Sequence, residues 1–285
     1  MNAPQDLRFL QLPRDATRPV PRQLVWSACS NKGPVRPTNE DSFVGVRFDA
    51  REVHRLGRHG DAALDTMDFA FAVSDGMGGE KAGELASRIA VEKITALMPR
   101  AFALAAKGID TGFADVLTEL FTRIHEAVTY LGRSYTECAR MQTTLSLGWF
   151  TPGWLYFAHI GDTRIYRLSE DGLRQLTDDD TYVGWLRRQG QINEREARTH
   201  PRKHILQKAL GAGNQFADPQ VGAVALEPGD RLLFCTDGVT DGLWDHSISD
   251  HLRLPSHPGQ AAELVEAAIR SGSRDNTTAV IVHVL

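Results

Sequence analysis

The chain has 285 residues, of which 42% are hydrophobic and 24% are charged, and its formal net charge is −4. This composition supports a sizeable apolar core, and the small negative charge excludes a global field that would attract nucleic acid or anionic membranes. No apolar stretch approaches the roughly 18 residues of a membrane span, and no signal-peptide region is visible. Three widely spaced cysteines fit neither a disulfide framework nor a zinc site, so we expect a cytoplasmic protein with reduced cysteines.

The first third of the chain begins with an arm and continues with two short strands. Residues 1–22 are rich in proline and arginine and show little periodicity, which predicts a poorly ordered arm ahead of a single domain over 23–285. Strands are expected at 23–30 and 43–48, and the charged, irregular residues 49–67 are expected to form a loop.

An apolar run that ends in a carboxylate forms the centre of the pattern. Residues 69–73 are typical of a strand buried on both faces, and Ser74, Asp75 and a glycine-rich turn follow. The device is repeated at 232–238, where an apolar run ends in Thr236, Asp237 and glycine. A single Asp-Gly is equally typical of a surface turn, but the repetition favours a shared site.

The remaining strands and helices do not alternate regularly along the chain. Paired strands are grouped around two long helices, which predicts an α+β layered domain rather than a parallel doubly wound fold. The expected helices cover 81–104, 113–131, 182–189 and 261–270, and the expected strands cover 143–150, 155–160, 164–168, 173–176, 231–235 and 277–285.

Five acids lie at the ends of apolar runs or in glycine-rich turns: Asp41, Asp75, Asp162, Asp237 and Asp275. Two carboxylates about 4 Å apart repel by roughly 4 kcal/mol at an effective dielectric near 20, so a cluster of them needs protons or cations. The ligands on offer are oxygen atoms, which favours Mg²⁺ or Mn²⁺, and a pair of such ions can activate water and clamp a phosphoryl group. Separate, solvated turn aspartates remain the alternative.

Other motifs narrow the chemistry. Arg36 offers a planar fork suited to a phosphate dianion, although a lone loop arginine is often only a surface residue. The chain has neither a GxxxxGK[ST] loop nor a GxSxG element, which disfavours nucleotide binding of that type and a serine hydrolase. The acidic run at 178–182 is interpreted as the start of a loop rather than as the site of an aspartyl nucleophile.

Taken together, six blocks in order over residues 36–276 resemble the metal-dependent protein phosphatase (PPM, type 2C) family in its bacterial branch. The blocks are Arg36-Pro-Thr-Asn39-Glu40-Asp41, Ser74-Asp75-Gly76-Met77-Gly78-Gly79, Gly161-Asp162-Thr163-Arg164, Leu176-Thr177 with Asp179, Cys235-Thr236-Asp237-Gly238, and Asp275-Asn276. The resemblance implies a four-layer α-β-β-α sandwich, with two antiparallel sheets flanked by helices and a dinuclear Mn²⁺ or Mg²⁺ site between the sheets.

The resemblance also implies a role for each matched residue. Asp75 would bridge the two ions. The Gly76 carbonyl and Asp41 would serve one ion, and Asp237 and Asp275 would serve the other. Asp162 would help to hold a weak third ion, and Arg36 would bind the substrate phosphate while a metal-activated water attacks it. Arg36, Asp75 and Asp237 are therefore the expected catalytic residues.

Two departures and one segment qualify the resemblance. Animal members have a histidine at the position of Met77, and methionine cannot protonate a leaving alkoxide. Asp180-Thr181 replaces the family's His-Ser. Residues 178–213 lie where the family has its mobile flap, and six Arg or Lys against two Glu at 187–203 could attract a phosphorylated peptide, or could simply form a solvated basic loop.

The function that the resemblance implies is a monomeric phosphoserine and phosphothreonine protein phosphatase in signal transduction. Its partners would be phosphorylated proteins, together with a bacterial Hanks-type kinase whose action it reverses. One alternative is a catalytically inactive relative that serves as a binding module. Another is a phosphatase of an anti-sigma antagonist, a group that typically lacks the arginine present here as Arg36.

Overall fold

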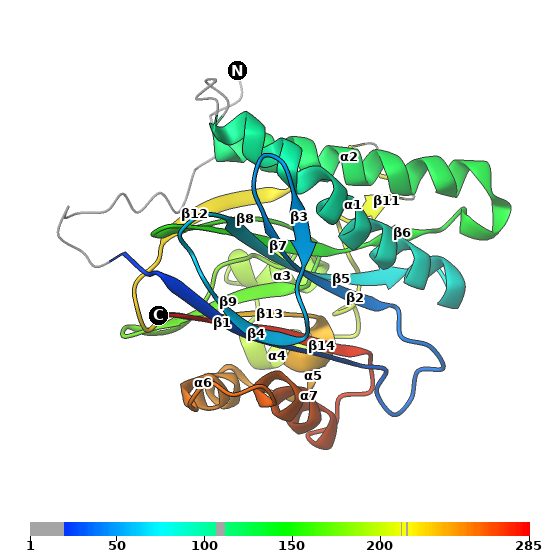
Figure 1. Cartoon of the computed structure of the whole chain (residues 1–285). Helices are drawn as coiled ribbons and strands as arrows, with labels where there is room; N and C mark the ends of the chain where they lie inside the picture. Colours follow the sequence, from blue (N-terminus) through cyan, green and yellow to red (C-terminus); the bar gives the residue numbers. More distant parts are fainter. Residues whose placement is uncertain (1–19, 107–111, 212, 215) are drawn as a thin grey trace.

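The protein consists of two antiparallel β-sheets that face each other, with helices on both outer sides (Figure 1). This arrangement was obtained as a computed structural model that describes residues 20–106, 112–211, 213–214 and 216–285. Most of the arm expected at 1–22 lies outside the described residues. The predicted α+β class and the four-layer α-β-β-α order are confirmed.

The first sheet has six strands in the order β10-β9-β13-β14-β1-β4, and every pairing in it is antiparallel. Its central strand β14 is buried along its whole length because it consists of β-branched and apolar residues between two neighbours. The strands are β1 (Gln23–Asn31), β4 (His59–Ala63), β9 (Arg164–Ser169), β10 (Gly172–Gln175), β13 (Arg231–Cys235) and β14 (Thr277–Val284).

The second sheet is built around β5, which pairs with β2 on one side and with β7 and β6 on the other. Beyond these strands, β3 pairs with β2, β8 and β12 follow β7, and β11 pairs with β6. The strands are β2 (Asp41–Phe48), β3 (Val53–Arg55), β5 (Asp68–Met77), β6 (Gln142–Thr143), β7 (Leu145–Thr151), β8 (Trp154–Ile160), β11 (Leu210–Gly211) and β12 (Gln220–Ala225).

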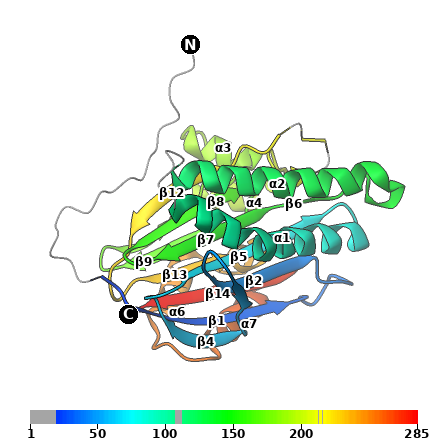
Figure 2. The ribbon, with the colours of Figure 1, turned by 45° about the horizontal axis from the view of Figure 1, so that its top comes forward.

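Helices cover the outer face of each sheet. Figure 2 shows α1 (Glu80–Ala106) and α2 (Phe113–Ser134) across the sheet that contains β5, β7 and β8. The opposite face carries α5 (Asp237–Gly242), α6 (Asp245–Arg253) and α7 (Gln260–Arg270). The segment 178–213 contains α3 (Tyr182–Arg188) and α4 (Glu194–Thr199), and a 3-10 turn covers Thr136–Cys138. Among the described residues, no helix combines the length and the apolar character needed to cross a membrane.

Three apolar cores lie between these layers. The core between the two sheets is strongly aromatic, and Trp26, Phe69, Phe71, Phe150 and Phe234 meet in it with ring centroids about 6 Å apart. One further core lies beneath α1 and α2, and another beneath α5, α6 and α7. Because the sheets are packed along most of their length, polar groups gather at the ends of the strands.

One predicted loop was wrong, and several helices and strands were not predicted. The loop predicted at 49–67 contains β3 and β4, two short and partly exposed strands whose polar residues hide the usual alternation. The sequence analysis did not predict β12, α4, α5 or α6. The α5 segment reads as two turns because it contains Asp237-Gly238 and Asp241-Gly242.

Candidate metal centre

Asp41 and Asp75 are direct partners on two neighbouring antiparallel strands, β2 and β5. Partners in such a pair project from the same face of a sheet, so both side chains lie on one side. The backbone at Asp75 is held firmly, because its carbonyl oxygen accepts from Thr143 Oγ1 at 2.7 Å and from the Thr144 amide at 2.9 Å. A break between β6 and β7 at Thr144 makes this double contact possible.

Asp41 connects the two sheets. Its Oδ2 accepts a hydrogen bond from Thr236 Oγ1 at 2.8 Å and another from Thr278 Oγ1 at 2.7 Å, and both threonines belong to the opposite sheet or its edge. Burial raises the pKa of Asp41 to about 7, although the two hydroxyl contacts act in the opposite direction. The carboxylate is thus taken out of water and held by hydroxyl groups rather than by a cationic side chain.

Asp237 and Asp162 belong to two different connections and line the same pocket. Asp237 is the first residue of α5, directly after β13, and Asp162 follows Gly161 in the turn between β8 and β9. Burial raises the pKa of Asp237 well above its usual value, and Asp162 is the charged neighbour with the largest further effect. The pKa of Asp162 is raised to about 7, first by burial and then by Asp179.

Asp275 lies in the loop before β14 and binds Arg36, whose Nη2 donates to Asp275 Oδ2 at 2.6 Å. Asn276 secures the loop that carries Arg36, because its Nδ2 donates to the carbonyl oxygens of Lys32 and Thr38. The pKa of the Arg36 guanidinium is raised by the bond to Asp275 and also by the charges of Asp237 and Asp75. Arg36 therefore faces the same acidic region as the other predicted residues.

These carboxylates share one polar region at the ends of the strands. Burial raises the pKa of Asp75 well above its usual value, and Asp41, Asp237, Asp162 and Asp275 each raise it further. Such a set of oxygen donors with excess negative charge suits Mg²⁺ or Mn²⁺.

Gly76 follows Asp75 in a place that admits no side chain. A Cβ atom there would lie 1.9 Å from the carbonyl oxygen of Gly83 at the start of α1. Close packing against α1 therefore requires glycine directly after Asp75.

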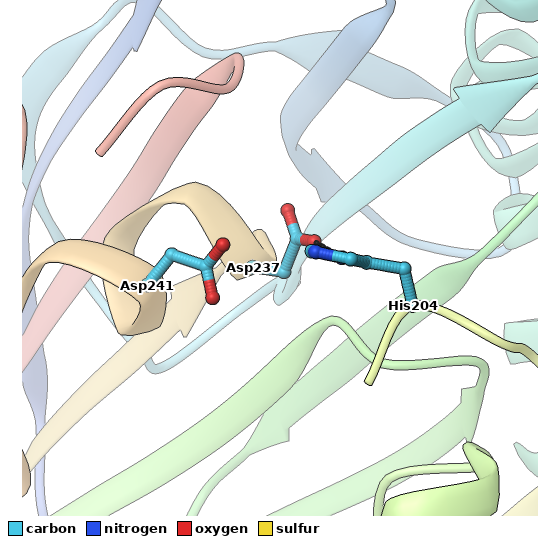
Figure 3. A group of neighbouring side chains, drawn as sticks. All are labelled: His204, Asp237 and Asp241. Atoms are coloured by element: carbon cyan, nitrogen blue, oxygen red, sulfur yellow. Dashed lines mark ion pairs between the residues drawn. The ribbon is translucent and has the colours of Figure 1, made fainter. Parts of the chain in front are cut away.

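The structure also brings together a group of candidate ligands that the sequence did not predict. Within the described part of the chain, the group of three with ligand atoms all within 4.8 Å consists of His204, Asp237 and Asp241 (Figure 3). The sequence analysis missed His204 and Asp241, although Asp241 lies four residues after Asp237 and so shares its helix face.

The start of the segment 178–213 holds the turn that carries Asp162. Arg164 donates to both carboxylate oxygens of Asp179, at 2.8 and 2.6 Å. The Gly161 amide donates to Asp180 Oδ2, and the Asp180 amide donates to the Gly161 carbonyl. Arg164 thus binds Asp179 rather than closing the turn on Asp162, and the acidic run is a loop start, as predicted.

The chain matches known proteins over most of its length. The sequence model of the family described as Protein phosphatase 2C matches residues 58–271. The chain is 32% identical over 266 residues to the serine/threonine protein phosphatase PstP of Mycobacterium tuberculosis. This match covers 92% of the chain but only 45% of PstP, so the chain spans less than half of that relative.

Two further matches are more complete. The serine/threonine phosphatase Stp of Listeria innocua is 31% identical over 255 residues, which cover 89% of this chain and 93% of Stp. A crystal structure of the PstP catalytic domain in complex with two manganese ions superposes with a TM-score of 0.72 at 29% identity, and covers 93% of this chain and 99% of that domain. These matches confirm the family resemblance and the fold that it implied: the chain belongs to the protein phosphatase 2C family.

Proposed function

We propose that the protein is a metal-dependent protein serine/threonine phosphatase. The observation that carries the proposal is the gathering of four other buried or half-buried carboxylates around Asp75, in a chain of the protein phosphatase 2C family. The relatives PstP and Stp bear the name of this activity, and the PstP catalytic domain binds two manganese ions.

In this proposal each acid has a defined task. Asp75 bridges two ions, with Asp41 and the Gly76 carbonyl on one of them and Asp237 and Asp275 on the other. Asp162 contributes to a weaker third site. Bound Mn²⁺ or Mg²⁺ supplies an activated water and screens the charge of the phosphoryl group. The two threonine hydroxyls on Asp41 keep that carboxylate pointed at the site.

Arg36 binds the phosphate dianion of the substrate. One of its nitrogens is held by Asp275, and its half-exposed side chain leaves the other donors of the fork available to a ligand. Asp275 thereby orients the guanidinium in addition to its task at an ion. An active phosphatase is favoured over a catalytically inactive relative, because the predicted acids and Arg36 all lie in one region.

The cellular setting follows from the substrate class. We infer phosphorylated serine and threonine proteins as substrates, a Hanks-type kinase as the opposing enzyme, and a monomer in cytoplasmic signal transduction. The catalytic domain would cover 23–285, and the segment 178–213 would act as its flap over the acidic region.

The test is hydrolysis of an aryl phosphate and of a phosphothreonine peptide in the presence of Mn²⁺ or Mg²⁺. Removal of divalent ions by a chelator is expected to abolish turnover, and re-addition is expected to restore it. Full activity after exhaustive chelation would contradict the proposal. A protein that binds the phosphopeptide and two ions but releases no phosphate would instead support the inactive binding module.

A further inference from the structure

Two arginines lie directly opposite each other at one edge of the first sheet. Arg167 on β9 and Arg174 on β10 are partners in an antiparallel pair, so both side chains project from the same face of the sheet. Leu232, the partner of Arg167 on β13, belongs to the core between the two sheets, which places both arginines on the inner face. Like charges in opposite positions destabilise a sheet, so a counter-charge beside this pair would stabilise it.

Asp230 supplies part of that counter-charge. Its Oδ2 lies 2.8 Å from Arg167 Nη2, and the side chains of the two residues are 2% and 15% exposed. Within the described part of the chain, the Nε of Arg167 is buried and has no hydrogen-bond partner. A guanidinium carries five N–H donors, and a buried donor without an acceptor is destabilising. The ion pair with Asp230 therefore leaves Arg167 with an unused donor.

Both arginines line a cavity between the edges of the two sheets. The cavity has a volume of about 170 Å³, and its lining also includes Ser169, Leu176 and Val224. Arg174 and Val224 belong to β10 and β12, which are the last strands in the order of their sheets. A water molecule needs about 10–15 Å³ of such space, so a small ion of several atoms fits. Arg174 is exposed, so the cavity opens to solvent at the sheet edge.

The charges of the lining favour an anion. Of the described residues that line the cavity, three are charged: Arg167, Arg174 and Asp171. Asp171 is exposed in the turn between β9 and β10, where solvent and salt screen its charge. Asp230, which neutralises part of Arg167, is not among the lining residues. A ligand in the cavity therefore meets donors from two guanidinium groups and one exposed carboxylate at the rim.

We propose that Arg167 and Arg174 form a binding site for a tetrahedral oxyanion of the phosphate class. Planar guanidinium forks match the oxygen atoms of such an ion, and one oxygen would accept from the unused Nε of Arg167. The site goes beyond the proposed function, because none of the proposed catalytic residues contributes to it. Arg167 lies five residues after Asp162 along an extended strand, on the order of 15 Å from the acidic region.

The test uses the full chain saturated with Mg²⁺ and follows the arginine Nε–H signals by NMR. Arg167→Lys identifies the signal of Arg167 and retains a cation beside Asp230. Inorganic phosphate is expected to shift this signal to saturation, whereas chloride at equal ionic strength is expected to leave it in place. Arg174→Ala is expected to weaken phosphate binding at this signal at least about tenfold, the effect of one lost hydrogen bond to a charged group.

Two further variants control for charge. Arg55→Ala removes an exposed arginine from β3 in the other sheet and is expected to leave the phosphate affinity unchanged. Asp171→Asn removes the carboxylate at the rim and is expected to tighten binding by up to about fivefold, the equivalent of one exposed ion pair. A signal of Arg167 that does not saturate, an equal shift with chloride, or equal affinity in Arg174→Ala overturns the proposal.

A second ligand distinguishes the two sources of such an anion. A peptide with a phosphonate analogue of phosphothreonine resists hydrolysis and presents the same oxygen atoms. If it shifts the Arg167 signal at lower concentration than inorganic phosphate does, the site binds a phosphorylated protein. If only inorganic phosphate shifts the signal, the site binds the free anion. Hydrolysis of an aryl phosphate by the same samples reports the proposed function, so failure of either proposal is visible without the other.

Discussion

Two stretches of this protein have the same sequence pattern and different structures. Ser74-Asp75-Gly76 and Thr236-Asp237-Gly238 both follow a buried apolar run. The first remains within β5, which continues to Met77, and the second ends a strand and starts α5. The hydroxyl groups also differ, because Ser74 bonds within its own sheet and Thr236 reaches across to Asp41.

Asp75 and Asp237 therefore have different surroundings. Asp75 is fixed by its pairing with Asp41 on one side and by hydrogen bonds from Thr143 and Thr144 to its carbonyl oxygen on the other, so its carboxylate has a rigid frame. Asp237 lies on a short helix that also carries Asp241. In the segment 178–213, His204 lies beside Asp237 and Lys203 binds Asp241. The pattern of an apolar run, a hydroxyl residue, Asp and Gly therefore specifies that a carboxylate is presented, but not on which kind of element.

The largest expected effect comes from neutralising either aspartate. Asp75→Asn and Asp237→Asn are each expected to lower kcat/KM by at least about 10³-fold, because loss of one preorganised electrostatic group alone can cost 10²–10³. Calorimetry should show weaker Mn²⁺ binding in both. Asp250→Asn, which changes an acid on α6, is a control for charge alone. Normal turnover in either variant would remove that aspartate from the proposed centre.

A pH-dependent effect distinguishes the two surroundings further. Asp162 is the largest charged contributor to the raised pKa of Asp237, but it ranks below Asp41 and Asp237 at Asp75. The pKa of Asp162 itself is raised from 3.8 to about 7 in the fold. The folded protein therefore binds more protons than the unfolded chain between these values, and its stability falls as pH rises through this window.

The corresponding prediction concerns Asp162→Asn without divalent ions. At about 1.4 kcal/mol for each pKa unit, the variant should be more stable than the parent by up to roughly 4 kcal/mol above pH 7, less the screening at this half-buried site. The advantage should vanish near pH 4. Urea unfolding of both proteins measures it, and the buried His159 and His283, whose lowered pKa values act in the opposite direction, cancel in the difference. A stability difference between the two proteins that does not change with pH would contradict the raised pKa of Asp162.

Many of the structural features compared here could be predicted from the sequence, and some could not. The apolar runs predicted β5, β13 and β14, because strands buried on both faces leave an unbroken signal. The start of α5 was hidden, since Asp237-Gly238 and Asp241-Gly242 resemble turns. The contacts of Thr236 and Thr278 with Asp41 join residues about 200 positions apart, so no local pattern encodes them. His204 lies in an irregular stretch of the segment 178–213, and no pattern in the sequence distinguishes it.

Arg36 faces both aspartates and should show an intermediate effect. Arg36→Ala is expected to raise KM more than it lowers kcat, with a loss of roughly 2–4 kcal/mol in kcat/KM, by analogy with oxyanion donors. Steady-state kinetics on a phosphothreonine peptide measures this. Arg274→Ala changes an exposed arginine next to Asp275 and should have little effect. If the two variants behave alike, Arg36 is only the ion-pair partner of Asp275.

The smallest effect tests the two hydroxyl groups directly. Ser74→Ala removes buried contacts to Thr143 Oγ1 and the Thr144 carbonyl, and Thr236→Val removes the contact to Asp41 and leaves the Thr278 amide without its acceptor. Each variant should lose about 1–2 kcal/mol of unfolding free energy, the usual cost of a buried polar group that has lost its partner. The free energy of unfolding alone therefore does not distinguish the contacts of Ser74 from those of Thr236.

The titration of Asp41 separates them. The hydroxyl of Thr236 stabilises the charged form of Asp41, so Thr236→Val should raise the pKa of Asp41 further above about 7. Ser74→Ala should leave that pKa unchanged, because Ser74 has its contacts within the β5 sheet. Carbon-detected NMR of the aspartate carboxyl groups in the metal-free protein reports both values. Equal shifts of the Asp41 pKa in the two variants would contradict this distinction. They would show that the hydroxyl groups of Ser74 and Thr236 affect Asp41 alike, although only Thr236 contacts it from the opposite sheet.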